Sequence, residues 1–160
     1  MSTYYGAKLA SSPVNGVNFD GGQVIGKNSE VFAEGDLCTI DASNGLKVAG
    51  ATDAIYGIAQ KAQTMASSNQ TVALVKPSVI VPDLDYEFIM GCNAALTALT
   101  SVGAFYKLTG TTGAMQVDVN SGVQTTTNRV VECTAVDPFG TGDTKCGKFR
   151  IVKRYNLMNY

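Results

Sequence analysis

The sequence contains no histidine and no tryptophan. The missing histidine excludes Ser-His-Asp and Cys-His catalysis, imidazole general bases and histidine metal sites in one step. The missing tryptophan removes the largest aromatic platform on which a ligand such as a sugar could stack. Neither glycine-rich phosphate-loop motif occurs among the 17 glycines, which excludes the usual routes to nucleotide binding. We therefore predict no cofactor, and function has to be argued from architecture and surface.

Charge is also scarce, with charged residues at 16% of the chain against about 25% in an average soluble domain. The net charge of −1 gives no general attraction to nucleic acid or to an anionic membrane. Such a composition suits a protein that neighbours cover on several sides, although an ordinary all-β domain with a neutral polar surface fits it as well.

Five of the twelve basic residues lie near the end of the sequence, at Lys145, Lys148, Arg150, Lys153 and Arg154. With the interleaved aromatic residues of the same stretch they resemble a nucleic-acid strip, but lysine and arginine also protect an edge strand from unwanted pairing. We predict the edge strand and no nucleic-acid partner.

The four cysteines Cys38, Cys92, Cys133 and Cys146 show no Cys-x-x-Cys spacing of a zinc or redox site. Three of them, Cys38, Cys92 and Cys133, lie within apolar strand patterns, where a free thiol behaves as a small buried hydrophobe. The first residues show no secretory signal pattern, so we expect reduced thiols and no metal. No apolar run approaches the roughly 20 residues that span a bilayer, so we predict no membrane partner.

One sequence pattern occurs twice in the chain, over residues 35–45 and 103–113. Each stretch begins at a glycine, continues through strand-like residues and a polar turn, and reaches a second glycine ten positions on. Apolar residues then return on alternate positions, at Leu46 and Val48 and at Met115, Val117 and Val119. This period of two predicts a pair of similar β-hairpins.

Further strand patterns are expected at 23–25, 55–59, 71–76, 79–81, 86–91, 129–136 and 148–154, with short helices over 58–67 and 93–99. Prolines at 77 and 82 favour an edge strand or an extended connection between them. The fold class is all-β, or mainly β with one or two short helices: a small antiparallel β-barrel, β-tulip or sandwich. Residues 1–22 are expected to form an extended N-terminal arm, and 23–160 a β-rich domain that would divide into two hairpin-based halves joined near 77–82.

Aromatic side chains in turn-rich segments are the candidate partner contacts: Tyr4, Tyr5, Phe19 and Phe139. The first three belong to the arm, and aromatic rings are costly to leave in water, which favours docking on a neighbour. A loop folded back on its own domain is the alternative for the arm. Phe139 lies in the loop 137–143, where a ring folded over its own loop is the alternative.

Asp83, Asp85 and Glu87 alternate along one stretch and would share one face of a strand. Three like charges could raise a pKa or hold calcium. Apolar residues occupy the opposite face, however, which is typical of a solvated strand, and we predict that structure. Carboxylate chemistry by these residues or Glu132 would require a cleft and a perturbed pKa.

Taken together, several local patterns resemble the decoration, or cement, proteins of tailed-bacteriophage heads and other small phage virion proteins. The resemblance spans roughly residues 31–153 and consists of strand and turn patterns, among them Gly35-Asp36-Leu37, Tyr56-Gly57-Ile58-Ala59, Tyr106-Lys107-Leu108, Val117-Asp118-Val119 and Gly147-Lys148-Phe149-Arg150-Ile151.

The resemblance implies a structural virion protein, made in the host cytoplasm, that binds the outer surface of the capsid. Its partners would be the major capsid protein and further copies of itself, with a trimer as the favoured oligomer. It would stabilise the shell by bridging capsid subunits. The alternative is a ligand- or carbohydrate-binding β-module of a head fibre or tail. An enzyme is the third hypothesis, and we predict that the protein is not one.

Overall fold

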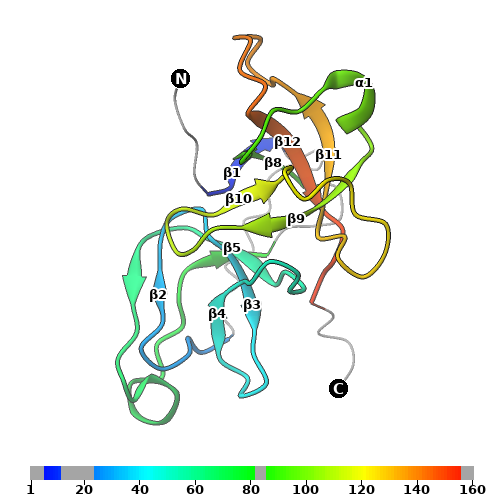
Figure 1. The fold of residues 1–160 in the computed structure, drawn as a ribbon. Helices are drawn as coiled ribbons and strands as arrows, with labels where there is room; N and C mark the ends of the chain where they lie inside the picture. The colour runs from blue at the N-terminus through cyan, green and yellow to red at the C-terminus, as the bar shows by residue number, and fades with distance from the viewer. Residues whose placement is uncertain (1–5, 12–23, 82–85, 156–160) are drawn as a thin grey trace.

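The computed structural model describes residues 6–11, 24–81 and 86–155, and over these the chain is mainly β with antiparallel sheets (Figure 1). This confirms the predicted fold class. A six-stranded sheet occupies the upper half of the view, and a four-stranded sheet with a two-stranded ribbon occupies the lower half.

The larger sheet has the strand order β1-β8-β12-β11-β9-β10, and each neighbouring pair is antiparallel. Its strands are β1 (Lys8–Ser11), β8 (Glu87–Gly91), β9 (Phe105–Thr109), β10 (Gln116–Asp118), β11 (Val131–Val136) and β12 (Cys146–Ile151). The sheet curls, and Cys92, directly after β8, forms a bridge with Val117 of β10. Buried side chains fill the inside of this half-barrel.

The smaller sheet has the order β4-β3-β5-β7, with β2 and β6 paired beside it. The strands are β2 (Val31–Phe32), β3 (Leu37–Ile40), β4 (Leu46–Val48), β5 (Gly57–Ala59), β6 (Gln63–Thr64) and β7 (Val79–Ile80). The edge position predicted between the two prolines is confirmed by β7. Two short helical segments complete the described chain, the π-helical turn Asn69–Ala73 and α1 (Ala98–Ser101).

Both repeated patterns form the predicted hairpins, β3 with β4 and β9 with β10. Asp36, which begins the first, is fully buried and connects the two. Its carboxylate accepts hydrogen bonds from the backbone N–H of Ala33 at 2.8 Å and of Gly113 at 3.0 Å. Gly113 lies in the turn of the second hairpin, so one buried side chain fixes the position of one hairpin against the other.

The hydrophobic interior has two clusters that meet at Val48. The larger includes Phe88 and Phe149 of the six-stranded sheet together with Leu37 and Ile58 of the four-stranded sheet. The smaller is built around Phe32 and Leu46, among others. Because side chains of both sheets fill the larger cluster, neither sheet buries its apolar face alone.

Several local predictions are wrong. Residues 24 and 25 of the strand predicted over 23–25 form no strand, and the helix predicted over 93–99 is present only from Ala98, where α1 begins. The helix predicted over 58–67 is replaced by strand residues of β5 and by β6, and the strand predicted over 71–76 overlaps the π-helical turn. Neither stretch has a regular local period that decides its structure. Long-range pairing decides the first, since β5 pairs with β3 and β6 with β2, and the hydrogen bonds of Asn69 to Gly26 and Val75 decide the second.

The basic stretch near the end is not an edge strand, because β12 lies between β8 and β11. Two of its cations pair with carboxylates on the two neighbouring strands. Lys148 Nζ lies 3.5 Å from Glu87 Oε2, and Arg150 Nη2 lies 2.7 Å from Glu132 Oε2. These cross-strand pairs explain why lysine and arginine are tolerated in the middle of the sheet.

The segment predicted as an arm is described over residues 6–11. Lys8–Ser11 forms β1, the edge strand that pairs with β8, and Ala7 N–H donates to Gly35 O at 2.6 Å. This part of the segment therefore belongs to the sheet of its own chain. Residues 12–22 lie outside the described residues.

Candidate functional site

Of the four predicted contact residues the structure describes one. Tyr4, Tyr5 and Phe19 lie outside the described residues. Phe139 lies in the loop that joins β11 to β12, and 53% of its surface is exposed. The Asp137 carboxylate orders this loop by accepting hydrogen bonds from the N–H groups of Gly142 at 2.7 Å and Thr141 at 3.0 Å. These bonds hold the pKa of Asp137 below its usual range.

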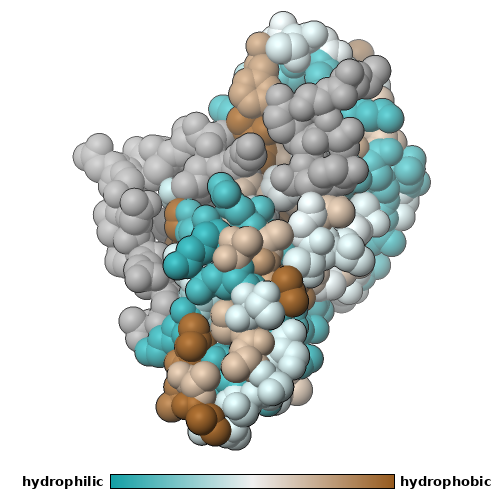
Figure 2. All heavy atoms as spheres, turned by 90° about the vertical axis from the view of Figure 1, so that its left-hand side faces the viewer, coloured by the Kyte–Doolittle hydropathy of each residue, from teal (hydrophilic) through white to brown (hydrophobic). Residues whose placement is uncertain are grey.

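The strongest candidate surface comes from residues that the sequence analysis did not select. Three aliphatic side chains, Val72, Leu74 and Val75, are 73%, 50% and 43% exposed. They belong to the π-helical turn and the residues directly after it; we call them the aliphatic tip. Figure 2 shows hydrophobic side chains gathered at the lower end of the molecule, the end that carries this turn in Figure 1.

A buried amide holds the tip in place. Asn69 is fully buried, and its Nδ2 donates to Gly26 O at 2.6 Å and to Val75 O at 3.0 Å. Its Oδ1 accepts from Val75 N–H at 3.0 Å. The side chain therefore closes the turn on itself and attaches it to the segment before β2, as a buried polar group must be hydrogen-bonded to be stable.

A second pair of hydrogen bonds adds to this attachment. Gln70 N–H donates to Asn28 Oδ1 at 2.7 Å, and Asn28 N–H donates to Gln70 Oε1 at 3.2 Å. Leu74 has the left-handed backbone with φ of 54°, which is costly for a leucine and persists only where the surroundings impose it. The chain thus maintains a strained, well-anchored turn that keeps aliphatic side chains in water.

At the other end of Figure 1, α1 and the β11–β12 loop both lie at the top of the view. Leu99 of α1 is 98% exposed, and Val102 directly after the helix is half exposed. With Phe139 they place a second set of apolar side chains at the end opposite the aliphatic tip. No periodic pattern marks either set, because exposure in turns depends on the tertiary fold.

The chemically reactive groups that the sequence offered are held in structural roles. All four cysteines are free and buried, which confirms the burial predicted for Cys38, Cys92 and Cys133. Burial raises the pKa of all four thiols, to about 11 for Cys133 and Cys146. They therefore stay protonated and weakly nucleophilic at neutral pH.

The candidate carboxylates that the structure describes are also held in structural roles, as partners in ion pairs. Glu87 pairs with Lys148 and Glu132 with Arg150, while Asp83 and Asp85 lie outside the described residues. Within the described part of the chain no group of three or more cysteine or acidic side chains is placed to hold a metal ion. No described helix is long and apolar enough to cross a membrane.

Comparison of the chain with protein-family models, with curated proteins and with solved structures found no match. The surfaces described above are therefore the basis on which function has to be argued.

Proposed function

We propose that this chain is a structural virion protein that binds the outer surface of a phage capsid and stabilises it by bridging major capsid subunits. The observation that supports this most directly is the aliphatic tip, a strained turn whose anchoring keeps Val72, Leu74 and Val75 in contact with water. A group of exposed aliphatic side chains on a polar, lightly charged protein is typical of a site that another protein covers.

The free energy that burial of the aliphatic tip contributes suits attachment of many copies to equal sites. Complete burial of one such side chain contributes about 1.5–3 kcal/mol, and these three are between two-fifths and three-quarters exposed. Each copy gains a modest binding free energy from burial of its tip. A capsid lattice presents many equal sites, and an oligomer that binds several of them at once gains avidity. We propose a homo-oligomer, with a trimer as the expected state.

The two apolar ends explain how one copy would bridge. The tip lies at one end, and Leu99, Val102 and Phe139 lie at the other. A protein that carries apolar contacts at both ends of a rigid β-framework can join two neighbours, which is the mechanical task of a cement protein. Every subunit joined in this way is stabilised by mass action in the assembled shell.

A carbohydrate-binding module is less well supported. Most aromatic side chains of the described residues are buried: Phe32, Tyr56, Tyr86, Phe88, Tyr106 and Phe149. Phe105 is half-buried, and the Arg129 guanidinium covers one of its faces at 4.6 Å from the ring centroid. A sugar requires an open aromatic face, and this arrangement provides little of one.

Cosedimentation with capsids from which the protein has been removed tests the proposal. The wild type is expected to rebind, whereas the double variant Val72→Ser, Leu74→Asn is expected to lose binding. Asparagine tolerates the left-handed backbone of position 74, so this variant should fold. Light scattering of the isolated protein is expected to show a defined oligomer.

Val123→Ser is the matched control, because Val123 is a half-exposed valine outside both apolar ends. It should bind as the wild type does. A monomer that fails to rebind stripped capsids would contradict the proposal, and equal binding by the double variant would show that the tip is not the contact.

A further inference from the structure

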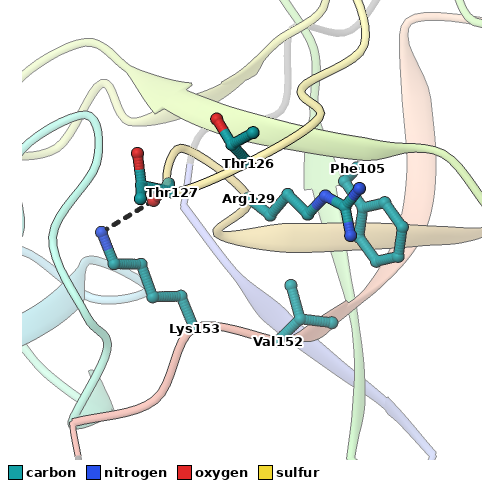
Figure 3. Close-up of a pocket in the computed structure, with 6 residues that line it drawn as sticks. All are labelled: Phe105, Thr126, Thr127, Arg129, Val152 and Lys153. Atoms are coloured by element: carbon teal, nitrogen blue, oxygen red, sulfur yellow. Dashed lines mark hydrogen bonds between the residues drawn. The ribbon is translucent and has the colours of Figure 1, made fainter.

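A groove of about 450 Å³ opens where the loop after β10 meets the end of β12. Phe105, Thr126, Thr127, Arg129, Val152 and Lys153 line it. In Figure 3 the Arg129 side chain extends over the Phe105 ring, Val152 lies below Arg129 and beside Lys153, and Lys153 points towards Thr127. The groove thus combines two cationic side chains with the apolar side chain of Val152.

The two cations lack a carboxylate partner among the described residues. The ion pairs there involve other cations: Lys27, Lys47, Lys107, Lys148 and Arg150. Among the described residues the Arg129 side chain contacts the Phe105 ring and forms no hydrogen bond, so its planar guanidinium is oriented while its side-chain N–H donors stay available. An oriented guanidinium loses less conformational freedom when it binds an anion.

Lys153 is also held in place. Its ammonium group donates to Thr127 O at 3.0 Å and to Thr52 O. An ammonium has three N–H donors, so one remains for a ligand. Thr126 and Thr127 are exposed and complete the lining. The groove therefore offers charged donors and an apolar side chain within one small volume.

We propose that this groove binds a carboxylate side chain of an acidic protein segment. Arg129 would bind the carboxylate through two parallel N–H donors, Lys153 would supply its remaining donor, and Val152 would contact the methylene groups of the glutamate or aspartate. A nucleic-acid backbone fits less well, because it is bound by a stripe of cations, whereas the groove has two and the chain has a net charge of −1.

The inference does not depend on the aliphatic tip or on the identity of the assembly, so a soluble probe tests it separately. The probe is an acetylated and amidated Gly-Glu-Val-Glu-Gly peptide, titrated into the ¹⁵N-labelled full chain and followed by NMR. Shifts are expected at the amides of Thr126, Thr127, Arg129 and Val152, with affinity that falls as salt is raised.

Arg129→Gln is expected to weaken binding about tenfold, since one charge-assisted hydrogen-bonded contact is worth about that factor. Arg129→Lys keeps the charge without the planar fork and should weaken binding less. Lys76→Gln is the matched control, because Lys76 is an exposed cation outside the groove, and it should bind as the wild type does. Arg129 is exposed, so these variants should keep the fold, which an unchanged unfolding midpoint would verify.

Three results would overturn the inference. The first is equal binding of the matching peptide with glutamine in place of glutamate. The second is peptide affinity unchanged by Arg129→Gln. The third is a single-stranded oligonucleotide that binds the groove more tightly than the peptide, which would assign the site to phosphate.

Discussion

At the scale of single residues, Asp36 has the most consequential position in the chain. Its buried carboxylate accepts one hydrogen bond from the backbone N–H of Ala33 and one from the backbone N–H of Gly113. Burial raises its pKa above the ordinary value of 3.8, while the two hydrogen bonds lower it in part. Asp36→Ala would leave both N–H groups without an acceptor, and we expect a loss of roughly 2–5 kcal/mol in the free energy of unfolding.

The raised pKa of Asp36 also predicts a pH dependence. The folded state holds the Asp36 proton more tightly than the unfolded state, so this contribution to stability is fully present below about pH 3.8 and is lost as pH rises through the folded pKa. The stability advantage of the wild type over Asp36→Asn should therefore be largest in acid and shrink as pH rises. Urea unfolding of both proteins from acid to neutral pH measures this difference.

The pH-dependent contributions of the other carboxylates cancel in the difference in stability between the wild type and Asp36→Asn. Asp41, Asp118 and Asp137 have lowered pKa values, so their stabilising contributions are lost as pH falls, but equally in both proteins. An advantage that grows towards neutral pH would contradict the assignment.

At the scale of elements, the two hairpins depend on glycines with positive φ, and two of these allow a matched test. Gly110 in the β9–β10 turn has a φ of 93°, and a Cβ there would overlap the Ala114 carbonyl oxygen. Gly103, before β9, has a similar φ of 79° but open space around the added atom. Gly103→Ala should cost about 1–2 kcal/mol from backbone strain alone.

Gly110→Ala adds a steric overlap with backbone to the same strain, so it should destabilise the fold clearly more than Gly103→Ala does. Thermal unfolding of the two variants side by side gives the comparison. Equal losses would mean that the turn relaxes around the new methyl group, and that the second hairpin is less rigid than the structure indicates.

The same elements show which parts of the structure the local sequence pattern can predict and which it cannot. The apolar residues on alternate positions after the second turn, Met115, Val117 and Val119, predicted the hairpin of β9 and β10 correctly. Residues 69–73 show why local pattern fails elsewhere. Their conformation depends on Asn69 reaching Gly26, more than forty residues earlier in the chain, and no sequence window includes both partners.

At the scale of the whole molecule, the two sheets share one interior. Leu37 and Ile58 of the smaller sheet pack in the same cluster as Phe88 and Phe149 of the larger. The chain after β12 adds backbone links, because Ile55 N–H donates to Lys153 O at 2.8 Å and Tyr155 N–H donates to Ile55 O at 2.9 Å. Neither sheet keeps its buried surface if the other unfolds.

We therefore expect unfolding in one cooperative transition. Far-ultraviolet circular dichroism, which reports the strands, and near-ultraviolet dichroism, which reports the packing of tyrosines, should give the same midpoint in urea. Two separate midpoints would indicate that the sheets unfold independently, and would imply that the shared cluster contributes little to stability.

Composition and periodicity by themselves determined the fold class, the two hairpins and the burial of Cys38, Cys92 and Cys133, because alternation of apolar residues is a local property that survives in any β-framework. Only the tertiary structure decided that β12 is a central strand, that Asp36 joins the hairpins, and that Val72, Leu74 and Val75 stay exposed. Each of these depends on contacts between residues distant in the sequence. The exposed surfaces on which the proposed function rests arise where several turns meet, so folding had to bring those turns together before the surfaces existed.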